Sequence, residues 1–206
     1  MPTPFDAAPA ITHLCAADPV FAALIAAVGP CTLQPTGHGF AALAETVVAQ
    51  QLSVPAAATI LGRLAALTDL TPTGMLAASD ARLREVGLSA QKARALRIAA
   101  SHFLTGALDS LPELDDHAAL TMLTALPGVG QWTAEIYLLF ALGRPDILPA
   151  ADLGLRNAAR QWYQLPVAPT SAALRGLAEV WRPHRSVAAW YLWRSRGVYR
   201  PATERA

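Results

Sequence analysis

Helical periodicity with matching cap residues runs through almost the whole chain, and this feature constrains its fold most strongly. About ten segments carry apolar residues at helical spacing, and short turns join them without a long linker. Ser53 and Ser89 stand at predicted helix starts, and Pro55 suits a first helical turn. Ala and Leu provide 44 and 30 of the 206 residues and favour helix, whereas strand-forming residues are scarce. We therefore predict an all-α fold.

The sequence carries no sign of a membrane segment or of a metal site built on cysteine or histidine. Its longest apolar stretch, residues 20–28, is far shorter than the roughly 20 residues of a membrane-spanning helix. The first basic residue, Arg63, comes too late for a signal peptide, so we expect a cytoplasmic protein. Two cysteines, Cys15 and Cys31, are too few for a four-thiolate site, and the histidines show no metal-binding spacing. We expect neither zinc nor an iron–sulfur cluster.

The net charge of +1 hides an uneven distribution of charge along the chain. Residues 111–140 hold four acidic and no basic side chains, whereas residues 141–206 hold ten basic and four acidic ones. In the last segment, arginines alternate with aromatic residues: Arg182, Arg185, Trp190, Tyr191, Trp193, Arg194, Arg196, Tyr199 and Arg200. Arginine beside aromatic rings suits a polyanion with stackable bases. A solvated helix face beside a few buried rings is the alternative interpretation.

An apolar turn with two glycines lies between two predicted helices, in the segment Leu123-Thr-Ala-Leu-Pro-Gly-Val-Gly-Gln-Trp-Thr-Ala134. Gly128 and Gly130 permit close backbone approach, so the amides of the turn and of the next helix can converge on an anion. Such a turn can hold one phosphate group. An ordinary corner between two helices is the alternative.

Five segments of the chain, in this order and spacing, match those of a known enzyme family. They are residues 47–54, 87–93, 126–134, 148–156 and 181–186. With these segments the sequence resembles the helix-hairpin-helix (HhH-GPD) DNA glycosylases, and within them the 3-methyladenine DNA glycosylase II (AlkA) type. The resemblance implies a short form without the N-terminal β domain of the best-known relative. It implies two helical lobes, a six-helix lobe (39–144) ending in the hairpin and a second lobe (1–38 plus 145–206), with an active-site cleft between them.

The resemblance also implies an activity, that of a monofunctional DNA glycosylase of base excision repair. Such an enzyme flips alkylated bases, of the 3-methyladenine and 7-methylguanine type, out of duplex DNA and hydrolyses the N-glycosidic bond, leaving an abasic site. Asp152 matches the family's catalytic aspartate, whose carboxylate stabilises positive charge on the deoxyribose. Without the family, Asp152 is a helix N-cap, and the two roles are compatible. Trp132 stands where lyase relatives carry a Schiff-base lysine, so we expect no lyase activity.

The resemblance further assigns the residues around the flipped base. Trp132 and Trp193 match positions that line the base pocket, and indole rings suit cationic alkylated bases. Ile136 aligns with a pocket aromatic of the best-known relative, and Tyr137 lies beside it. Gln51 matches the wedge that fills the gap left by the base, and Leu52 is its rival. The other tryptophans, Trp162, Trp181 and Trp190, are expected in the core.

Contacts with the DNA backbone follow from the same resemblance. The hairpin would bind phosphate through Gly128, Val129, Gly130 and Thr133. Further candidates for phosphate contacts are Lys92, Arg156 and Arg185. The main-chain carbonyls of Thr124, Leu126 and Val129 would hold a structural Na⁺ or K⁺ ion, and no other cofactor is expected.

Duplex DNA containing alkylated bases is the expected partner of the chain. We expect a monomer without an obligate protein partner or membrane association, used at the nucleoid of a bacterial cytoplasm. Two alternatives stay open from the sequence. One is a non-catalytic helix-hairpin-helix module that grips duplex DNA, and the other is a glycosylase with lyase activity, against which Trp132 argues.

Overall fold

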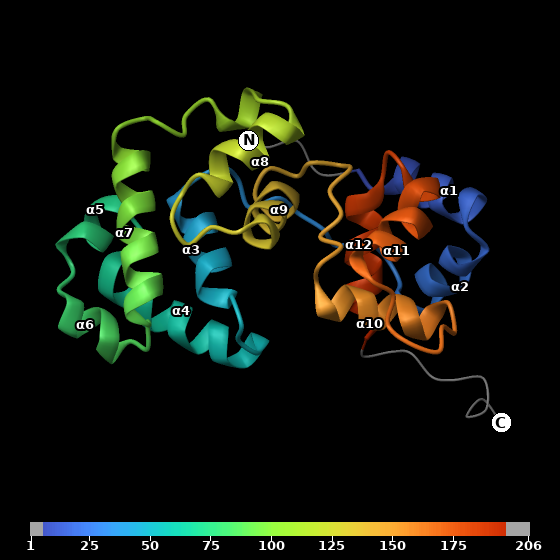
Figure 1. Ribbon diagram of the computed structural model, residues 1–206, viewed down its shortest axis with the longest axis horizontal. Helices are drawn as coiled ribbons and strands as arrows, with labels where there is room; N and C mark the ends of the chain where they lie inside the picture. The colour runs from blue at the N-terminus through green and yellow to red at the C-terminus, as the bar shows by residue number, and fades with distance from the viewer. Residues whose placement is uncertain (1–5, 197–206) are drawn as a thin grey trace. The chain divides into compact units, whose positions relative to one another are not determined.

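The computed structural model describes residues 6–196, and helices joined by loops make up this range (Figure 1). Between residues 6 and 196, α-helices and two 3-10 helices follow one another without a β-strand, which confirms the predicted all-α fold. None of the described helices is both long enough and apolar enough to cross a membrane.

The chain forms two compact units. Residues 36–142 form the first, which we call the hairpin unit, and the described residues up to Pro35 and from Gly143 onward form the second, which we call the terminal unit. The chain passes from one unit to the other close to residues 39 and 144, where the sequence analysis placed the lobe boundaries. Both passages lie in the stretches rich in proline and glycine.

Seven α-helices and one 3-10 helix build the hairpin unit. They are α3 (Phe40–Ala49), α4 (Val54–Thr68), α5 (Pro72–Ala77), α6 (Asp80–Glu85), α7 (Ala90–Leu104), η1 (Leu111–Glu113), α8 (Asp116–Thr124) and α9 (Gln131–Phe140). The sequence analysis expected six helices in this lobe. The structure has seven because the short helices α5 and α6 both form, each with its own cap. Thr71 Oγ1 accepts the amide of Gly74, and Ser79 Oγ accepts the amide of Arg82.

Helix α7 supports the other helices of the hairpin unit, because it packs against α3, α5 and α6. Ser89 caps it as predicted and accepts the amide of Lys92. Ser53 occupies the N-cap of α4, but its side chain makes no capping hydrogen bond. The buried side of α7 carries mostly alanine, including Ala95 and Ala99, and these small residues let neighbouring backbone come close.

The terminal unit consists of helices from both ends of the described chain. They are α1 (Ala8–Ala17), α2 (Pro19–Val28), α10 (Leu153–Trp162), α11 (Ser171–Leu177), η2 (Ala178–Trp181) and α12 (Arg185–Ser195). Figure 1 shows the blue helices α1 and α2 beside the red helix α12, which also packs against α10. Residues 186–192 of α12 are all buried, as expected for a helix surrounded by others.

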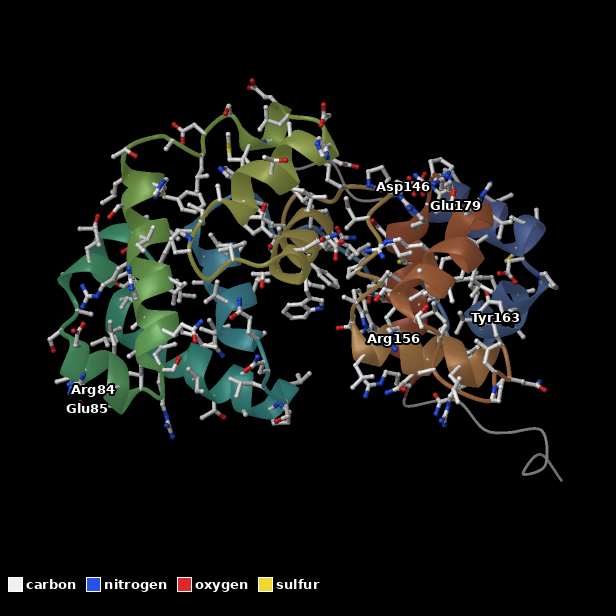
Figure 2. The ribbon with its side chains drawn as sticks, viewed as in Figure 1. Arg84, Glu85, Asp146, Arg156, Tyr163 and Glu179 are labelled. Atoms are coloured by element: carbon white, nitrogen blue, oxygen red, sulfur yellow. The ribbon has the colours of Figure 1, made fainter. Side chains whose placement is uncertain are left out.

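A buried polar cluster joins the early and late segments of the terminal unit. Asp18 caps α2 by accepting the amide of Val20, and its other oxygen accepts the Trp181 indole N–H at 2.9 Å. The Tyr163 hydroxyl donates to the same oxygen (Tyr163 is labelled in Figure 2). Burial and this hydrogen bond to a carboxylate both raise the pKa of Tyr163. These bonds satisfy the hydrogen-bonding capacity of a carboxylate that is almost fully buried.

Candidate functional site

The two glycines of the hairpin turn (residues 125–130) differ in their backbone conformation and in the space around them. Gly128 has φ of +85°, and a Cβ atom on it would lie 2.5 Å from the Ala95 Cβ of α7. Gly130 has an ordinary φ of −84°, and a Cβ atom on it would meet nothing within 4 Å. Gly128 is therefore required by the fold, whereas Gly130 leaves its backbone open to a molecule outside the unit.

The start of helix α9 is suited to an anion. Gly130 is the N-cap of α9, and no side chain caps this helix. Val129 and Leu126 are both 4% exposed and hold the turn in the apolar core of the unit. The first amides of a helix have no intrahelical acceptor and lie at the positive end of the helix dipole. The geometry therefore fits a phosphate bound by backbone amides.

Thr133 does not face outward from the hairpin. Its side chain is only 2% exposed, and its hydroxyl accepts a hydrogen bond of 2.8 Å from Gln50 Nε2. The same Gln50 nitrogen donates to the main-chain oxygen of Gly128 at 3.0 Å. The predicted phosphate contact from Thr133 is therefore wrong for its side chain, which instead braces the turn through Gln50.

The candidate wedge lies in a turn between α3 and α4, residues 50–53, which we call the wedge turn. Gln51 has φ of +57° and is exposed, and Leu52 is 38% exposed, so both side chains are accessible. The choice between them stays a prediction. Gln50 ties the turn to the hairpin, and sequence reasoning missed this role. Little in the sequence indicates this role beyond the neighbouring pair Gln50-Gln51. An amide side chain that bridges two loops does not belong to a motif with a fixed spacing.

Lys92 also anchors the wedge turn. Its Nζ donates two hydrogen bonds of 2.8 Å, to the main-chain oxygens of Val48 and Gln50. These carbonyls lie at the end of α3, where carbonyl groups lack intrahelical donors. Burial lowers the pKa of Lys92. Two of the three N–H groups of Lys92 are therefore used within the unit, and its phosphate contact stays a prediction.

Asp152 occupies the N-cap of α10, in the terminal unit. Its Oδ1 accepts the amide of Leu155 at 2.7 Å and the indole N–H of Trp193 at 2.9 Å. Two donors on two different helices, α10 and α12, therefore orient one half-buried carboxylate. The predicted N-cap role is confirmed. A carboxylate fixed in this way can stabilise a positive charge that develops next to it.

The expected base-pocket residues of α9 differ in their surroundings. Trp132 and Ile136 are half-buried and lie one helical turn apart on the same side of α9. Tyr137 has 0% exposure, accepts the amide of Gly39 at 3.0 Å and is hydrogen-bonded to His38 Nδ1 at 2.8 Å. Burial raises the pKa of Tyr137 to about 12. Tyr137 is therefore a core residue rather than a pocket wall, which corrects the prediction.

The remaining tryptophans are buried as expected: Trp162, Trp181 and Trp190 are at most 9% exposed.

Comparison with known proteins identifies the family. Residues 44–183 match the profile of the HhH-GPD superfamily of base excision DNA repair proteins. The chain belongs to this superfamily. It is 30% identical over 198 residues to the alkylbase DNA glycosidase-like protein mag2 of Schizosaccharomyces pombe, covering 91% of this chain and 93% of that protein. It is 33% identical over 160 residues to DNA-3-methyladenine glycosylase 1 of the same organism, covering 74% of this chain and 70% of that protein.

A solved structure agrees with this assignment. The S. pombe 3-methyladenine DNA glycosylase Mag1, in complex with abasic DNA, superposes with a TM-score of 0.87 at 29% identity. The match covers 94% of this chain and 100% of that one. The resemblance stated from the five sequence segments is therefore confirmed.

Two predicted phosphate contacts of this HhH-GPD protein are engaged in the terminal unit. Arg185 forms an ion pair with Asp146 through Nε at 2.7 Å and through Nη2 at 2.9 Å, and its side chain is 13% exposed. Arg156 Nε donates to the main-chain oxygen of Pro169. Figure 2 shows Asp146 and Arg156 in this unit. Arg185 is thus held by Asp146, whereas the bond to Pro169 uses only Nε of Arg156. The phosphate contacts of both arginines stay predictions.

The cation predicted at the hairpin of an HhH-GPD protein would need main-chain ligands. Leu126 O accepts the amide of Val129 at 3.0 Å and keeps a second lone pair. Thr124 ends α8, where the last carbonyls lack intrahelical donors. The oxygen donors thus fit a hard cation. Among residues 6–196, no group of three or more His, Cys, Asp or Glu side chains could hold a metal ion.

Proposed function

We propose that this HhH-GPD protein is a monofunctional DNA glycosylase that excises alkylated bases of the 3-methyladenine and 7-methylguanine type from duplex DNA. The observation that carries the proposal is the Asp152 carboxylate, held by Leu155 and Trp193 in a chain of this superfamily. Relatives named as 3-methyladenine DNA glycosylases support the choice of substrate class.

The reaction follows from the position of one carboxylate beside a sugar. The bond between C1′ and the base nitrogen breaks, the electron pair leaves with the base, and positive charge develops on the deoxyribose. Asp152 stabilises this charge and orients a water molecule that attacks C1′ and loses its proton to Asp152 and then to solvent. Because both fixing hydrogen bonds go to Oδ1, the carboxylate keeps one orientation during the reaction. The products are a free base and an abasic site.

The absence of a suitable amine supports hydrolysis without strand cleavage. A lyase needs an amine that attacks C1′ and forms a Schiff base. Trp132 stands at the family position of that lysine, and Lys92 is the only lysine of the chain. Its Nζ is bonded to two carbonyls of the wedge turn region.

Trp132 and Trp193 supply the rings that would hold the base. Alkylation leaves the base cationic or electron-poor, and such a ring is attracted to the face of an indole. Its glycosidic bond is also weaker, so a site with one carboxylate can suffice. Ile136 would add an apolar contact where other members have an aromatic ring.

Binding of duplex DNA is assigned to the hairpin and the wedge turn. The amides of Gly128 and Gly130 and the uncapped start of α9 would bind a phosphate. A Na⁺ or K⁺ ion on the carbonyls of Thr124, Leu126 and Val129 would add positive charge there. Gln51 or Leu52 would fill the gap left in the duplex. We propose that the protein acts as a monomer in the bacterial cytoplasm.

The decisive test measures release of free methylated base from duplex DNA treated with dimethyl sulfate. Asp152→Asn keeps a capping side chain, so the fold should survive while the negative charge is lost. We expect base release to fall by about 10² to 10⁴-fold, with duplex affinity nearly unchanged. If the wild type and the variant both bind duplex without releasing base, the protein is a binding module. A DNA adduct trapped by borohydride would contradict the monofunctional assignment.

A further inference from the structure

The guanidinium of Arg196 lies beside the carboxylate of Asp152, in the terminal unit. A Cβ atom on Gly154 would lie 2.7 Å from Arg196 Nη1 and 3.0 Å from Asp152 Oδ1. Both charged groups therefore meet over the same glycine. Arg196 follows Trp193 by three residues at the end of α12, so both side chains reach the start of α10 from one side of α12.

Three described arginines near Arg196 in the sequence have partners within the protein. Arg182 and Arg185 pair with Asp146. Arg194 lies over the ring of Trp190, with Cζ 5.4 Å from the centroid. Arg196 is exposed, and within residues 6–196 the ion pairs of this region are made by Arg182 and Arg185 and not by Arg196. Its donors remain available to an anion from outside.

The lack of a side chain at Gly154 leaves room for the guanidinium of Arg196. Gly154 lies in the first turn of α10, where its φ is not positive, so the backbone conformation does not require glycine. Glycine is a poor helix former, and alanine would suit the helix itself better. The space that a Cβ atom would fill is taken by Arg196 and by the Asp152 carboxylate. The neighbouring charged groups therefore explain the glycine.

The positive charge of Arg196 at this position opposes the reaction unless a phosphate binds it. Positive charge develops on the deoxyribose next to Asp152, and a cation nearby disfavours it. A phosphate bound to Arg196 would neutralise that cation. A nucleotide whose sugar reaches Asp152 brings its own phosphates along, and arginine binds phosphate through two parallel N–H···O bonds.

We propose that Arg196 binds a backbone phosphate of the flipped nucleotide and so places its deoxyribose against Asp152. This assignment rests on the proposed glycosylase function. Arg196 is thus a substrate-binding residue next to the carboxylate, and Gly154 is the position that admits its side chain.

The first test compares Arg196→Ala with Arg160→Ala, an exposed arginine at the other end of α10. The probes are a duplex with a stable abasic-site analogue and the same duplex undamaged. Arg196→Ala should weaken binding to the abasic duplex about tenfold or more. It should lower the slope of log affinity against log salt by about 0.9, whereas Arg160→Ala leaves that slope unchanged. The undamaged duplex should lose less affinity, because its nucleotides stay stacked.

Gly154→Ala provides a second variant that keeps the charge and favours the helix. The new methyl group would meet the guanidinium of Arg196 at 2.7 Å and the Asp152 carboxylate at 3.0 Å, so affinity for the abasic duplex should fall toward that of Arg196→Ala. In the double variant the two losses should not add, since both act on one contact. Full additivity would contradict the assignment.

Kinetics separate this role from a structural one. Arg196→Ala removes the contact that places the deoxyribose against Asp152, so base release by saturating enzyme should fall by about threefold or more while the dissociation constant rises, whereas Arg160→Ala should leave both near the wild type. Equal salt slopes for the two alanine variants, or equal losses on both duplexes, would overturn the assignment of Arg196. Failure of the wild type to release base would instead overturn the proposed function, because the binding readouts do not depend on catalysis.

Discussion

The hairpin of the hairpin unit and the Asp152 region of the terminal unit are built in opposite ways. At the hairpin, the start of α9 has no side-chain cap, and the polar side chains of Gln50, Lys92 and Thr133 brace the turns from within the unit. Around Asp152, the side chains themselves form the site and the backbone supports them through one capping bond.

This difference between a backbone site and a side-chain site predicts which substitutions each region tolerates. A site made of amides can bind any phosphate and does not depend on the identity of its side chains, provided that the turn keeps its shape. A site made of one carboxylate depends on that residue and on the donors that orient it. Stability should therefore respond most to changes at the hairpin, and chemistry most to changes around Asp152.

The two hairpin glycines give the largest expected effect on stability. Gly128→Ala forces a methyl group against Ala95 at positive φ, so the free energy of unfolding should fall by about 2 to 5 kcal/mol. Gly130→Ala meets no neighbour, so stability should change by less than about 0.5 kcal/mol while duplex affinity falls roughly tenfold. Urea unfolding and duplex titrations measure both. Equal destabilisation by the two variants would contradict the different reasons given for these glycines.

Trp193→Phe, compared with a control variant, tests the role of the hydrogen bond to Asp152. The variant keeps an aromatic ring but removes the indole N–H that orients Asp152 Oδ1. Base release under single-turnover conditions should fall by about 10 to 100-fold, since one hydrogen bond to a charged group is lost. Trp190→Phe on the same helix is the matched control, and its rate should stay near that of the wild type. A larger effect of Trp190→Phe would mean that the packing of α12, not the hydrogen bond, controls the rate.

Neighbouring glutamines of the wedge turn give the smallest expected effect. Gln50→Met keeps the side-chain length but loses the bonds to Gly128 and Thr133, so the free energy of unfolding should fall by about 1 to 2 kcal/mol. Gln51→Met lies at the exposed tip and should leave stability nearly unchanged. If Gln51 is the wedge, this second variant should still slow base extrusion, measured with a fluorescent base beside the lesion. Identical unfolding curves for the two variants would show that Gln50 does not brace the turn.

The sequence predicted the fold well, because helical spacing and caps are local signals. Ser89 and Asp152 cap their helices as expected. Ser53 stands at an N-cap without making the capping bond, so residue type alone did not determine the contact. With the short helices α5 and α6, the hairpin unit has seven α-helices instead of the six that were expected.

The candidate site residues differ in how far the sequence could assign them. Asp152 and the glycines could be assigned because they belong to motifs with a fixed order and spacing along the chain. Lys92, Arg185 and Thr133 were assigned to DNA because their side chains can bind phosphate, yet each one is occupied by a partner distant in sequence. Such partners follow from packing in three dimensions, which no local spacing indicates.

The polar cluster around Asp18 sets an order for folding during synthesis. Asp18 bonds to residues 145 and 163 positions further along the chain, whereas the hairpin unit is one continuous segment. The hairpin unit can therefore close while the ribosome is still making the last helices. Helices α1 and α2 are made before the hairpin unit, whereas their partners Tyr163, Trp181 and α12 are made after it. The apolar surface of α1 and α2 therefore stays uncovered until the segments that follow the hairpin unit have been made.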